Sequence, residues 1–387
     1  IGVLIAVLPP LLFGVDWTTS ITRATVFIVA AAPCALVISI PITLVASLGT
    51  GARQGVLIKG GVYLEELAKV RVVAMDKTGT LTRSQPEVTD VLVRQRERQG
   101  PPASPQEVLA MAAGVERRSE HPLARAVVEY AKSQAIAPVE THDFQSLTGA
   151  GAMARSDGTT LYVGSPELFS QQLGLTLDSS QDDIRRLQEQ GKTVIVVGDQ
   201  NQTWGLIAIR DNLRPNAQQA IQALHEWGVQ NVVMLTGDNA RTAQALAHEA
   251  GIDEFYAELK PEDKVAKVRE LSERHGHVAM VGDGVNDAPA LAEATVGVAM
   301  GAAGTDVALE TADVALMADD LGRLAYALQL AKRNQSVVNQ NLALSTIIIG
   351  TLVIGAIAGL LTLPLAVLGH EISEFLVIGN GMRMLRA

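Results

Sequence analysis

The sequence lacks most of the features that would mark a secreted, disulfide-bonded or nucleic-acid-binding protein. It contains a single cysteine, Cys34, in 387 residues, so no disulfide can form within the chain, and this count leaves the redox compartment open. The net charge of −10 argues against nucleic acid as a partner. The chain begins at Ile1 inside an apolar run without a basic segment or cleavage site, so we do not expect this run to be a signal peptide. We interpret it as a fragment whose amino-terminal part is absent.

The composition is intermediate between that of a soluble enzyme and that of a membrane bundle. Hydrophobic residues make up 48% and charged residues 19% of the chain, and the mean hydropathy is +0.22. A length of 387 residues is enough for two or three domains. These values predict membrane helices attached to a soluble part.

Four apolar stretches are expected to cross a membrane, and we therefore expect lipid around them. They cover residues 1–15 (a truncated helix), 21–48, 336–360 and 361–384. Their polar connections at 16–20 and near Pro364 are very short, whereas basic residues lie at the other ends: Arg53, Lys59, Lys332, Arg333, Arg383 and Arg386. The positive-inside rule then predicts a multi-pass protein, of a bacterial plasma membrane, with its soluble domains in the cytoplasm.

The soluble region divides by its pattern of strands and helices. Residues 49–86 and 203–322 alternate apolar strand runs, among them 203–210, 231–236 and 278–282, with helical segments, which is typical of an α/β domain. Residues 87–202 show a different succession of loops, helices and strands, which predicts an inserted α+β domain.

The string Asp76-Lys77-Thr78-Gly79-Thr80-Leu81-Thr82 follows a short apolar run of strand character. A carboxylate at the carboxyl end of a parallel strand lies where open α/β sheets carry their chemistry, and an aspartate there can attack a phosphoryl group. The alternative for a single Asp-Lys-Thr is a capping turn.

Three further motifs supply what phosphoryl transfer needs. They are Thr236-Gly237-Asp238-Asn239, Lys264, and Gly282-Asp283-Gly284-Val285-Asn286-Asp287-Ala288-Pro289. We expect Asp76 and Asp283, with the Thr78 carbonyl, to hold Mg²⁺, and Thr236 and Lys264 to hold phosphoryl oxygens. Asn286 and Asp287 would support this ring. Taken alone, Thr-Gly-Asp is a common turn, and Lys264 is most often a solvated helix lysine.

In this order the motifs resemble the phosphorylation domain of P-type ATPases, a branch of the haloacid dehalogenase-like fold. Soluble phosphatases of that fold carry a second Asp two residues after the nucleophile, where this chain has Thr78. Without a nearby acid/base, an acyl phosphate on Asp76 is expected to persist, as a pump intermediate requires.

A second group of residues indicates a nucleotide site in the inserted domain. His121 precedes Pro122 at a predicted helix start, where a capping histidine is the simplest explanation, and Gly149, Gly151 and Gly164 follow. The segment Ser119-Glu120-His121-Pro122-Leu123 with these glycines resembles the nucleotide-binding domain of heavy-metal (type IB) P-type ATPases. That resemblance implies that ATP is surrounded by Glu116, His121, Gly149, Gly151 and Gly164. No Gly-X₄-Gly-Lys-Ser/Thr occurs, so the chain is not a P-loop enzyme.

Ionisable groups inside the apolar stretches indicate a site in the membrane. Pro33 cannot donate to the Val29 carbonyl, so we expect a kink that frees this oxygen beside Cys34. Further along, His370, Glu371 and Glu374 would be costly in lipid unless they serve a site, and His370 and Glu374 share a helical face. The alternatives are a packed cysteine and charges in the headgroup region.

The Pro33-Cys34 pair resembles the heavy-metal branch of the family, and His370-Glu371 is similar to the His-Glu-Gly-(Gly/Ser)-Thr motif of its cobalt/zinc-type subgroup. The chain departs from that subgroup at Ala32, Ile372 and Glu374. One thiolate with imidazole and carboxylate suits a divalent transition metal such as zinc, cobalt, nickel, iron or cadmium better than Cu⁺.

The sequence thus predicts α-helical transmembrane segments, a haloacid dehalogenase-like α/β phosphorylation domain and an inserted α+β nucleotide-binding domain. The expected function is ATP-driven export of a divalent heavy metal through phosphorylated Asp76. No Thr-Gly-Glu occurs, so we expect that the actuator domain and the earlier membrane helices of the same protein are missing, and that this chain alone does not complete transport. Alternatives are a membrane-tethered phosphatase, a non-catalytic metal-binding membrane module, and a potassium, calcium or lipid pump, which Cys34 after Pro33 disfavours.

Overall fold

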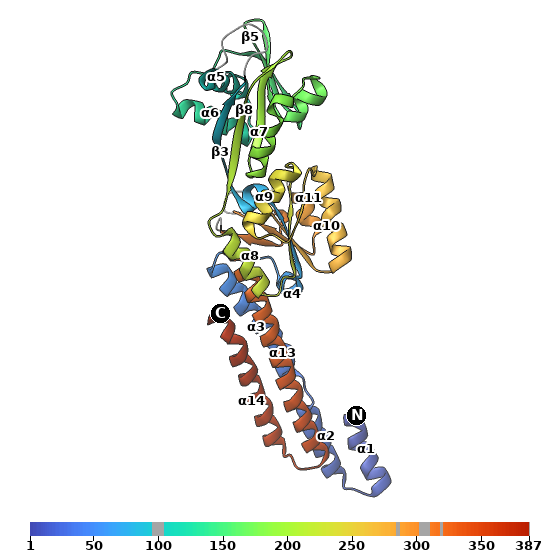
Figure 1. The fold of residues 1–387 in the computed structure, drawn as a ribbon. Coiled ribbons are helices and arrows are strands. Elements are labelled where there is room, and N and C mark those ends of the chain that lie inside the picture. Colours follow the sequence, from blue (N-terminus) through green and yellow to red (C-terminus); the bar gives the residue numbers. More distant parts are fainter. Residues whose placement is uncertain (95–103, 284–286, 302–309, 318–319, 387) are drawn as a thin grey trace. The chain divides into compact units, whose positions relative to one another are not determined.

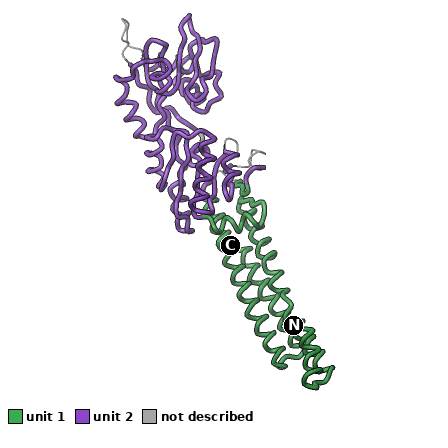
Figure 2. The backbone as a smooth tube through the Cα atoms, turned by 90° about the vertical axis from the view of Figure 1, so that its right-hand side faces the viewer, with its two compact units in different colours: residues 1–70, 313–318, 323–387 green, residues 71–312, 319–322 purple. Residues whose placement is uncertain are grey.

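The computed structural model describes residues 1–94, 104–283, 287–301, 310–317 and 320–386. Contacts divide the chain into two compact units (Figure 2). One unit contains residues 1–70, 313–318 and 323–387 and is mainly helical, and the other contains residues 71–312 and 319–322 and is α/β.

The helical unit is built from long apolar helices. Figure 1 shows α2 (Trp17–Ala30) and α3 (Cys34–Arg53) following one another along the bundle, with α13 (Gly322–Ile357) and α14 (Leu363–Gly381) beside them. The short helices α1 (Gly2–Phe13) and α4 (Gly61–Lys69), the turn Met382–Arg386, and an antiparallel pair of short strands, β1 (Val56–Ile58) and β13 (Val314–Leu316), complete the unit.

Two stretches of the described chain are long and apolar enough to cross a membrane, Trp17–Arg53 with a hydropathy of 2.4 and Gly322–Ile357 with 1.8. Within the first stretch the helix is interrupted between Ala30 and Cys34. The four spans expected from the sequence stay predictions, because length and composition alone are weak indications.

The α/β unit contains a parallel sheet, whose strands and helices we call the core domain. Its strands run in the order β12 (Val296–Ala299), β11 (Val278–Gly282), β2 (Val72–Asp76), β9 (Asn231–Leu235) and β10 (Glu254–Tyr256), and all of these neighbours are parallel. The helices are α8 (Ala217–Glu226), α9 (Ala240–Ala250), α10 (Pro261–His275) and α11 (Ala288–Glu293). Side chains of β2, β9 and β11 pack with those of α10 and α11 in one buried cluster. Strands buried on both faces need continuous apolar runs, which confirms the α/β prediction.

The second sheet, which we call the insert domain with its helices, is antiparallel. Its strands run in the order β3 (Thr82–Val93), β8 (Thr203–Leu213), β7 (Thr193–Asp199), β6 (Thr159–Gly164), β5 (Gly151–Ser156) and β4 (His142–Leu147). The helices α5 (Pro105–Glu116) and α6 (Pro122–Ser133) share a buried cluster with one set of strand residues, such as Ile207. The short helix at Leu168–Gln172 and α7 (Asp178–Glu189) share a cluster with the alternate set, such as Leu206. Successive strand residues face opposite sides, so helices cover both faces of the sheet.

The strand at 203–210 lies elsewhere than we expected. We grouped it with the α/β part, but β8 pairs with β3 and β7 in the antiparallel sheet. Its residues 204–209 are all buried, so the run has the appearance of a central parallel strand. Its antiparallel pairing with Thr193–Asp199 and with the distant Thr82–Val93 distinguishes the two cases. The other domain boundaries stay predictions.

Two glycines allow β5 and β6 to approach each other closely, and this close packing leads to a testable prediction. Gly151 faces Gly164 in the ladder, and a Cβ on Gly151 would lie 2.2 Å from the Val163 carbonyl oxygen. Gly149 has a positive φ of 72°, but nothing lies within 4 Å of its Cβ position. We therefore expect Gly149→Ala to lower the free energy of unfolding by about 1 kcal/mol, because alanine is disfavoured in the left-handed conformation. Gly151→Ala must in addition push the two strands apart.

Hydrogen exchange of the β5 and β6 amides in the purified chain measures this difference. The expected result is much faster exchange in Gly151→Ala than in Gly149→Ala. Equal protection in the two variants would contradict the close approach at Gly151.

Candidate functional site

The carboxyl ends of three neighbouring strands place the predicted phosphoryl residues at one edge of the core sheet. Asp76 is the last residue of β2 and pairs in register with Leu235 of β9, while Met75 pairs with Val281 of β11. Because the strands are parallel, Thr236 and Asp283 follow at the same edge on either side of Asp76. The sheet thus assembles the three motifs that are far apart in the sequence.

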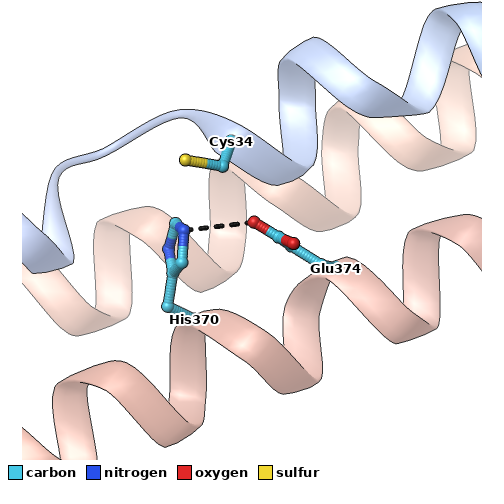
Figure 3. Close-up of side chains that lie close together, drawn as sticks. All are labelled: Cys34, His370 and Glu374. Carbon is cyan, nitrogen blue, oxygen red and sulfur yellow. Dashed lines mark ion pairs between the residues drawn. The ribbon is translucent and has the colours of Figure 1, made fainter.

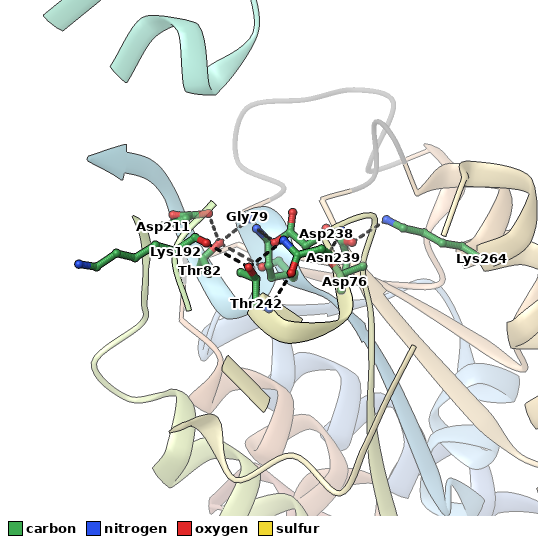
Figure 4. A network of polar contacts seen from close by, with 11 residues as sticks. Asp76, Gly79, Thr82, Lys192, Asp211, Asp238, Asn239, Thr242 and Lys264 are labelled. Carbon is green, nitrogen blue, oxygen red and sulfur yellow. Dashed lines mark hydrogen bonds and ion pairs between the residues drawn. The ribbon is translucent and has the colours of Figure 1, made fainter. Parts of the chain in front are cut away.

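Lys264 connects two buried carboxylates at this edge, and Figure 4 shows its contact with one of them, Asp76. Its Nζ lies 2.6 Å from Asp76 Oδ1 and 2.8 Å from Asp287 Oδ1. Asp76 is 7% and Asp287 2% exposed. Lys264 is therefore no solvated helix lysine, because it offsets two charges that burial would otherwise make very costly.

Burial also sets the protonation of this site. Burial raises the pKa of Asp76 to about 6, and the nearby Asp287 carboxylate adds to this, while Lys264 opposes it. Burial alone would lower the pKa of Lys264, but the two carboxylates outweigh it and the pKa is raised. Lys264 is therefore charged, and Asp76 changes charge near neutral pH.

The donor set at the edge fits a magnesium ion. Asp76, Asp283 and Asp287 outnumber Lys264, and Asp287 Oδ2 is buried without a hydrogen-bond partner among the described residues. Hard carboxylate oxygens with excess negative charge are what Mg²⁺ prefers. Thr78 is exposed in the turn after Asp76. Asn286, which we predicted to support this ring, lies outside the described residues.

The neighbouring motif residues are tied to each other. Lys77 Nζ lies 2.6 Å from Asp238 Oδ2, and the Asp238 N–H donates to Thr236 Oγ1 over 3.1 Å. A Cβ on Gly237 would lie 3.3 Å from the Leu259 carbonyl oxygen, so the loop is closely packed there. These contacts fix the loop after β9 beside the loop after β2.

Two residues that the sequence analysis missed hold the turn after Asp76. Arg214, which is 6% exposed, donates from Nη2 to the Gly79 carbonyl over 2.7 Å and from Nε to the Thr80 carbonyl over 2.6 Å. Thr82 Oγ1 donates to Asp211 Oδ2 over 2.5 Å, and burial raises the pKa of that carboxyl. The signal available was the pair of charges in Asp211-Asn212-Leu213-Arg214-Pro215 that ends an apolar strand.

The predicted nucleotide residues of the α5–α6 turn lie on either side of it. Glu116 ends α5 and is 9% exposed, and burial raises its pKa to about 7. His121 is the N-cap of α6, and its Nδ1 accepts from the Leu123 N–H over 3.2 Å. Desolvation lowers the pKa of His121, so the imidazole is neutral, with its proton on Nε2. The capping role is present, and Nε2–H is left as a donor.

The three predicted glycines differ in their surroundings. Gly151 and Gly164 are opposite each other in the β5–β6 ladder, and a Cβ on Gly164 would lie 2.3 Å from the Ala150 carbonyl oxygen. Close strand packing accounts for both. Gly149 has open space at its Cβ position and is the glycine of the three whose backbone is accessible to a ligand.

In the helical unit, the structure groups three of the four predicted metal-site residues (Figure 3). The ligand atoms of Cys34, His370 and Glu374 all lie within 4.8 Å of one another. His370 Nε2 lies 3.3 Å from Glu374 Oε1, one turn away on α14. His370 Nδ1 is buried without a hydrogen-bond partner among the described residues. Glu371 is exposed on the same helix, and the structure does not bring it into this group.

Pro33 breaks the helix in a different way from the one we expected. α2 ends at Ala30 and α3 begins at Cys34, but the Val29 carbonyl is not left free, since it accepts from the Ala32 N–H over 3.3 Å. A tighter turn at the end of α2 supplies that donor. Cys34 is the first residue of α3, where the helix dipole favours a negative charge on its sulfur.

Comparisons with known proteins agree with this architecture. The family model of haloacid dehalogenase-like hydrolases matches residues 70–295. A probable cadmium-transporting ATPase of Alkalihalophilus pseudofirmus is 42% identical over 389 residues, which cover 100% of this chain and 53% of the relative. A manganese-exporting P-type ATPase of Mycobacterium tuberculosis is 42% identical over 370 residues, 95% of this chain and 51% of the relative.

Among solved structures, a zinc-transporting PIB-type ATPase in its E2.Pi state matches 100% of this chain and 61% of that chain, with a TM-score of 0.79 and 39% identity. The chain spans about half the length of the curated relatives it matches. By its matched family model, its fold and its relatives, the chain belongs to the haloacid dehalogenase-like hydrolases, as a member of the heavy-metal (type IB) P-type ATPases.

Proposed function

We propose that this chain forms an aspartyl phosphate on Asp76 from ATP, and that this phosphorylation drives the export of a divalent heavy-metal ion by the whole pump. The observation that carries the proposal is the position of Asp76 at the end of β2, paired with Lys264 and followed on the neighbouring strands by Thr236 and Asp283. A buried carboxylate beside a fixed cation and oriented donors is the arrangement that phosphoryl transfer requires.

In the proposed step, an ionised Asp76 oxygen forms a bond to the γ-phosphorus while the bond to the β,γ-bridging oxygen breaks and ADP leaves. Lys264 moves from the carboxylate to a phosphoryl oxygen, and Thr236 Oγ1 donates to another. A bound Mg²⁺, held by Asp76, Asp283 and the Thr78 carbonyl, would supply positive charge against the phosphates. Because Thr78 carries no acid/base, nothing at that position speeds hydrolysis of the product.

ATP is proposed to lie with its base at the α5–α6 turn. Glu116 and the His121 Nε2–H, for which no partner is described among the residues of the structure, support this, since together they offer an acceptor and a donor to a base edge. The open backbone at Gly149 is consistent with close approach of the ribose, whereas the geometry gives Gly151 and Gly164 a packing role.

The cargo is proposed to bind at Cys34, His370 and Glu374. A thiolate, an imidazole and a carboxylate form a borderline set that suits divalent zinc, cadmium, cobalt and neighbouring ions. The relatives' names include cadmium, manganese and zinc, and the soft Cys34 sulfur favours the zinc and cadmium end of that range. We place the helical unit in a bacterial plasma membrane, with both α/β domains in the cytoplasm.

The first test is the nucleophile. Asp76→Asn is expected to abolish the acid-stable phosphoenzyme formed from radiolabelled ATP, because a carboxamide cannot form an acyl phosphate. Asp253→Asn is the matched control. Asp253 accepts from the Val232 N–H at the opposite end of β9, and this variant should be phosphorylated normally. A labelled Asp76→Asn protein, or rapid turnover of a simple phosphomonoester instead, would overturn the pump assignment.

A pH dependence follows from the pKa of about 6 at Asp76. Below this value the raised pKa keeps the carboxyl protonated and unable to attack, so the initial phosphorylation rate should fall as the pH drops through about 6 at low Mg²⁺. Asp287→Asn removes a negative neighbour and should shift the midpoint to lower pH, whatever it does to the maximal rate. An unchanged midpoint in Asp287→Asn would contradict the coupling.

The cargo site is tested by titrating the purified chain with Co²⁺ and following the thiolate-to-cobalt absorption band. Cys34→Ala should abolish the band, and His370→Ala and Glu374→Gln should each weaken binding by more than the about 10- to 100-fold that supporting residues contribute. Glu371→Gln, which changes a carboxylate outside the group, should bind like the unaltered chain. Loss of binding in Glu371→Gln alone would move the site away from Cys34.

A further inference from the structure

A buried amide on α13 joins the two helices that carry the proposed metal ligands. Asn341 is 0% exposed, and its Nδ2 donates to Thr43 Oγ1 of α3 over 3.4 Å. Its Oδ1 accepts from Asn380 Nδ2 of α14 over 2.8 Å. A carboxamide in an apolar helix bundle is costly unless it is paired at both ends, as this one is. We call Asn341, Thr43 and Asn380 the amide clamp.

Neighbouring contacts hold the clamp in place. Arg383 Nη1 donates to Asn380 Oδ1 over 2.9 Å from the turn after α14, and Thr43 Oγ1 donates to the Ser39 carbonyl over 2.7 Å. A Cβ on Gly381 would lie 2.8 Å from Thr43 Oγ1, so α14 and α3 touch here. The clamp is therefore a point at which side chains of α3, α13 and α14 are hydrogen-bonded to one another.

The clamp and the metal ligands lie on the same two helices. At about 1.5 Å per residue, Cys34 is ~13 Å from Thr43 along α3, and Glu374 is ~9 Å from Asn380 along α14. A slip of α14 by one helical turn would displace His370 and Glu374 by about 5.4 Å relative to Cys34. That exceeds the 4.8 Å within which the three ligand atoms lie. The group therefore exists in one register of α14 against α3.

We propose that Asn341 is a positioning residue whose hydrogen bonds to Thr43 and Asn380 set the register of α14 against α3 and so hold Cys34, His370 and Glu374 in one coordination sphere. The hydrogen bonds described for Asn341 reach none of the three ligands, so it acts through the two helices it joins. The inference rests on the proposed cargo site, and it extends that site to residues nearer the cytoplasmic ends of the helices.

A second buried amide on the same face of α13 provides a matched control. Asn334 is 2% exposed, and its Oδ1 accepts from Ser47 Oγ of α3 over 2.8 Å. This bond joins α13 to α3, and no contact described for Asn334 involves α14. Asn334→Leu thus removes a comparable buried hydrogen bond without the proposed effect on register.

Cross-linking measures the register independently of any metal. Cys34 is the only cysteine of the chain, so His370→Cys creates a single possible pair, between α3 and α14. A short thiol-reactive bifunctional reagent, applied to membranes containing the 387-residue chain, should join the two positions, as detected by peptide mass spectrometry. Adding Asn341→Leu or the isosteric Thr43→Val should reduce the yield severalfold, whereas adding Asn334→Leu should leave it unchanged.

Asn380→Leu removes the bond to Asn341 and also the contacts of Asn380 with Gln340 and Arg383, so it should lower the yield at least as far as Asn341→Leu. Undiminished cross-linking in both Asn341→Leu and Thr43→Val overturns the proposal, and so does an equal loss in Asn334→Leu. Thr43→Val, which keeps the size of the side chain, separates lost register from misfolding in Asn341→Leu.

With His370 restored, Co²⁺ titration should show Asn341→Leu weakened about 10-fold, with Asn334→Leu unchanged. Unchanged cobalt affinity in Asn341→Leu contradicts the positioning role but leaves the proposed cargo site intact. The absence of a cobalt band in the unaltered chain would instead refute the cargo site, and the positioning role with it, even where cross-linking shows that the clamp sets the register.

Discussion

The shared ion pairing of Lys264 with Asp76 and Asp287 is the interaction on which the core site depends. Parallel pairing of β11, β2 and β9 forces carboxylates to one buried edge, where they repel each other and lose hydration. One ammonium group offsets part of that cost and leaves an excess of negative charge. Burial, together with the Asp287 carboxylate, raises the pKa of Asp76, and the excess of negative charge makes the edge a place for a hard cation. The packing of this edge, the protonation of Asp76 and the proposed cation binding thus all depend on the position of Lys264 between two carboxylates.

Much of this site could be predicted from sequence, because its residues follow strands and a parallel sheet brings strand ends together. Asp76, Thr236 and Asp283 each come directly after an apolar run, so their convergence needed no knowledge of strand order. Arg214 could not be predicted in the same way. Arg214 reaches the turn after Asp76 because β8 pairs with β3. These two segments lie far apart in the chain, and the apolar run of β8 resembles that of a parallel strand.

The helical unit shows a similar limit. Helical spacing grouped His370 with Glu374, and the Pro33 break could be read from one residue, but both the Val29 carbonyl and the amide clamp depend on neighbours that spacing does not reveal. Inside an apolar bundle, a few paired polar groups define the register that uniform aliphatic packing leaves loose. Nothing in the sequence distinguishes Asn341 from other polar residues, and its proposed role follows only from its two hydrogen-bond partners.

The ladder pairing of Thr82 with Leu213 has a consequence for the architecture as a whole. The chain leaves the core domain and returns to it at adjacent positions, so the two ends of the insert domain lie next to each other. Because these two ends are held together by strand pairing, a longer or shorter insert adds no loop-closure entropy to the core domain. Exchange of inserts between related chains, or circular permutation within one, would leave the Asp76 edge geometrically undisturbed. The insert domain can thereby change in evolution while the geometry of the Asp76 edge stays constant.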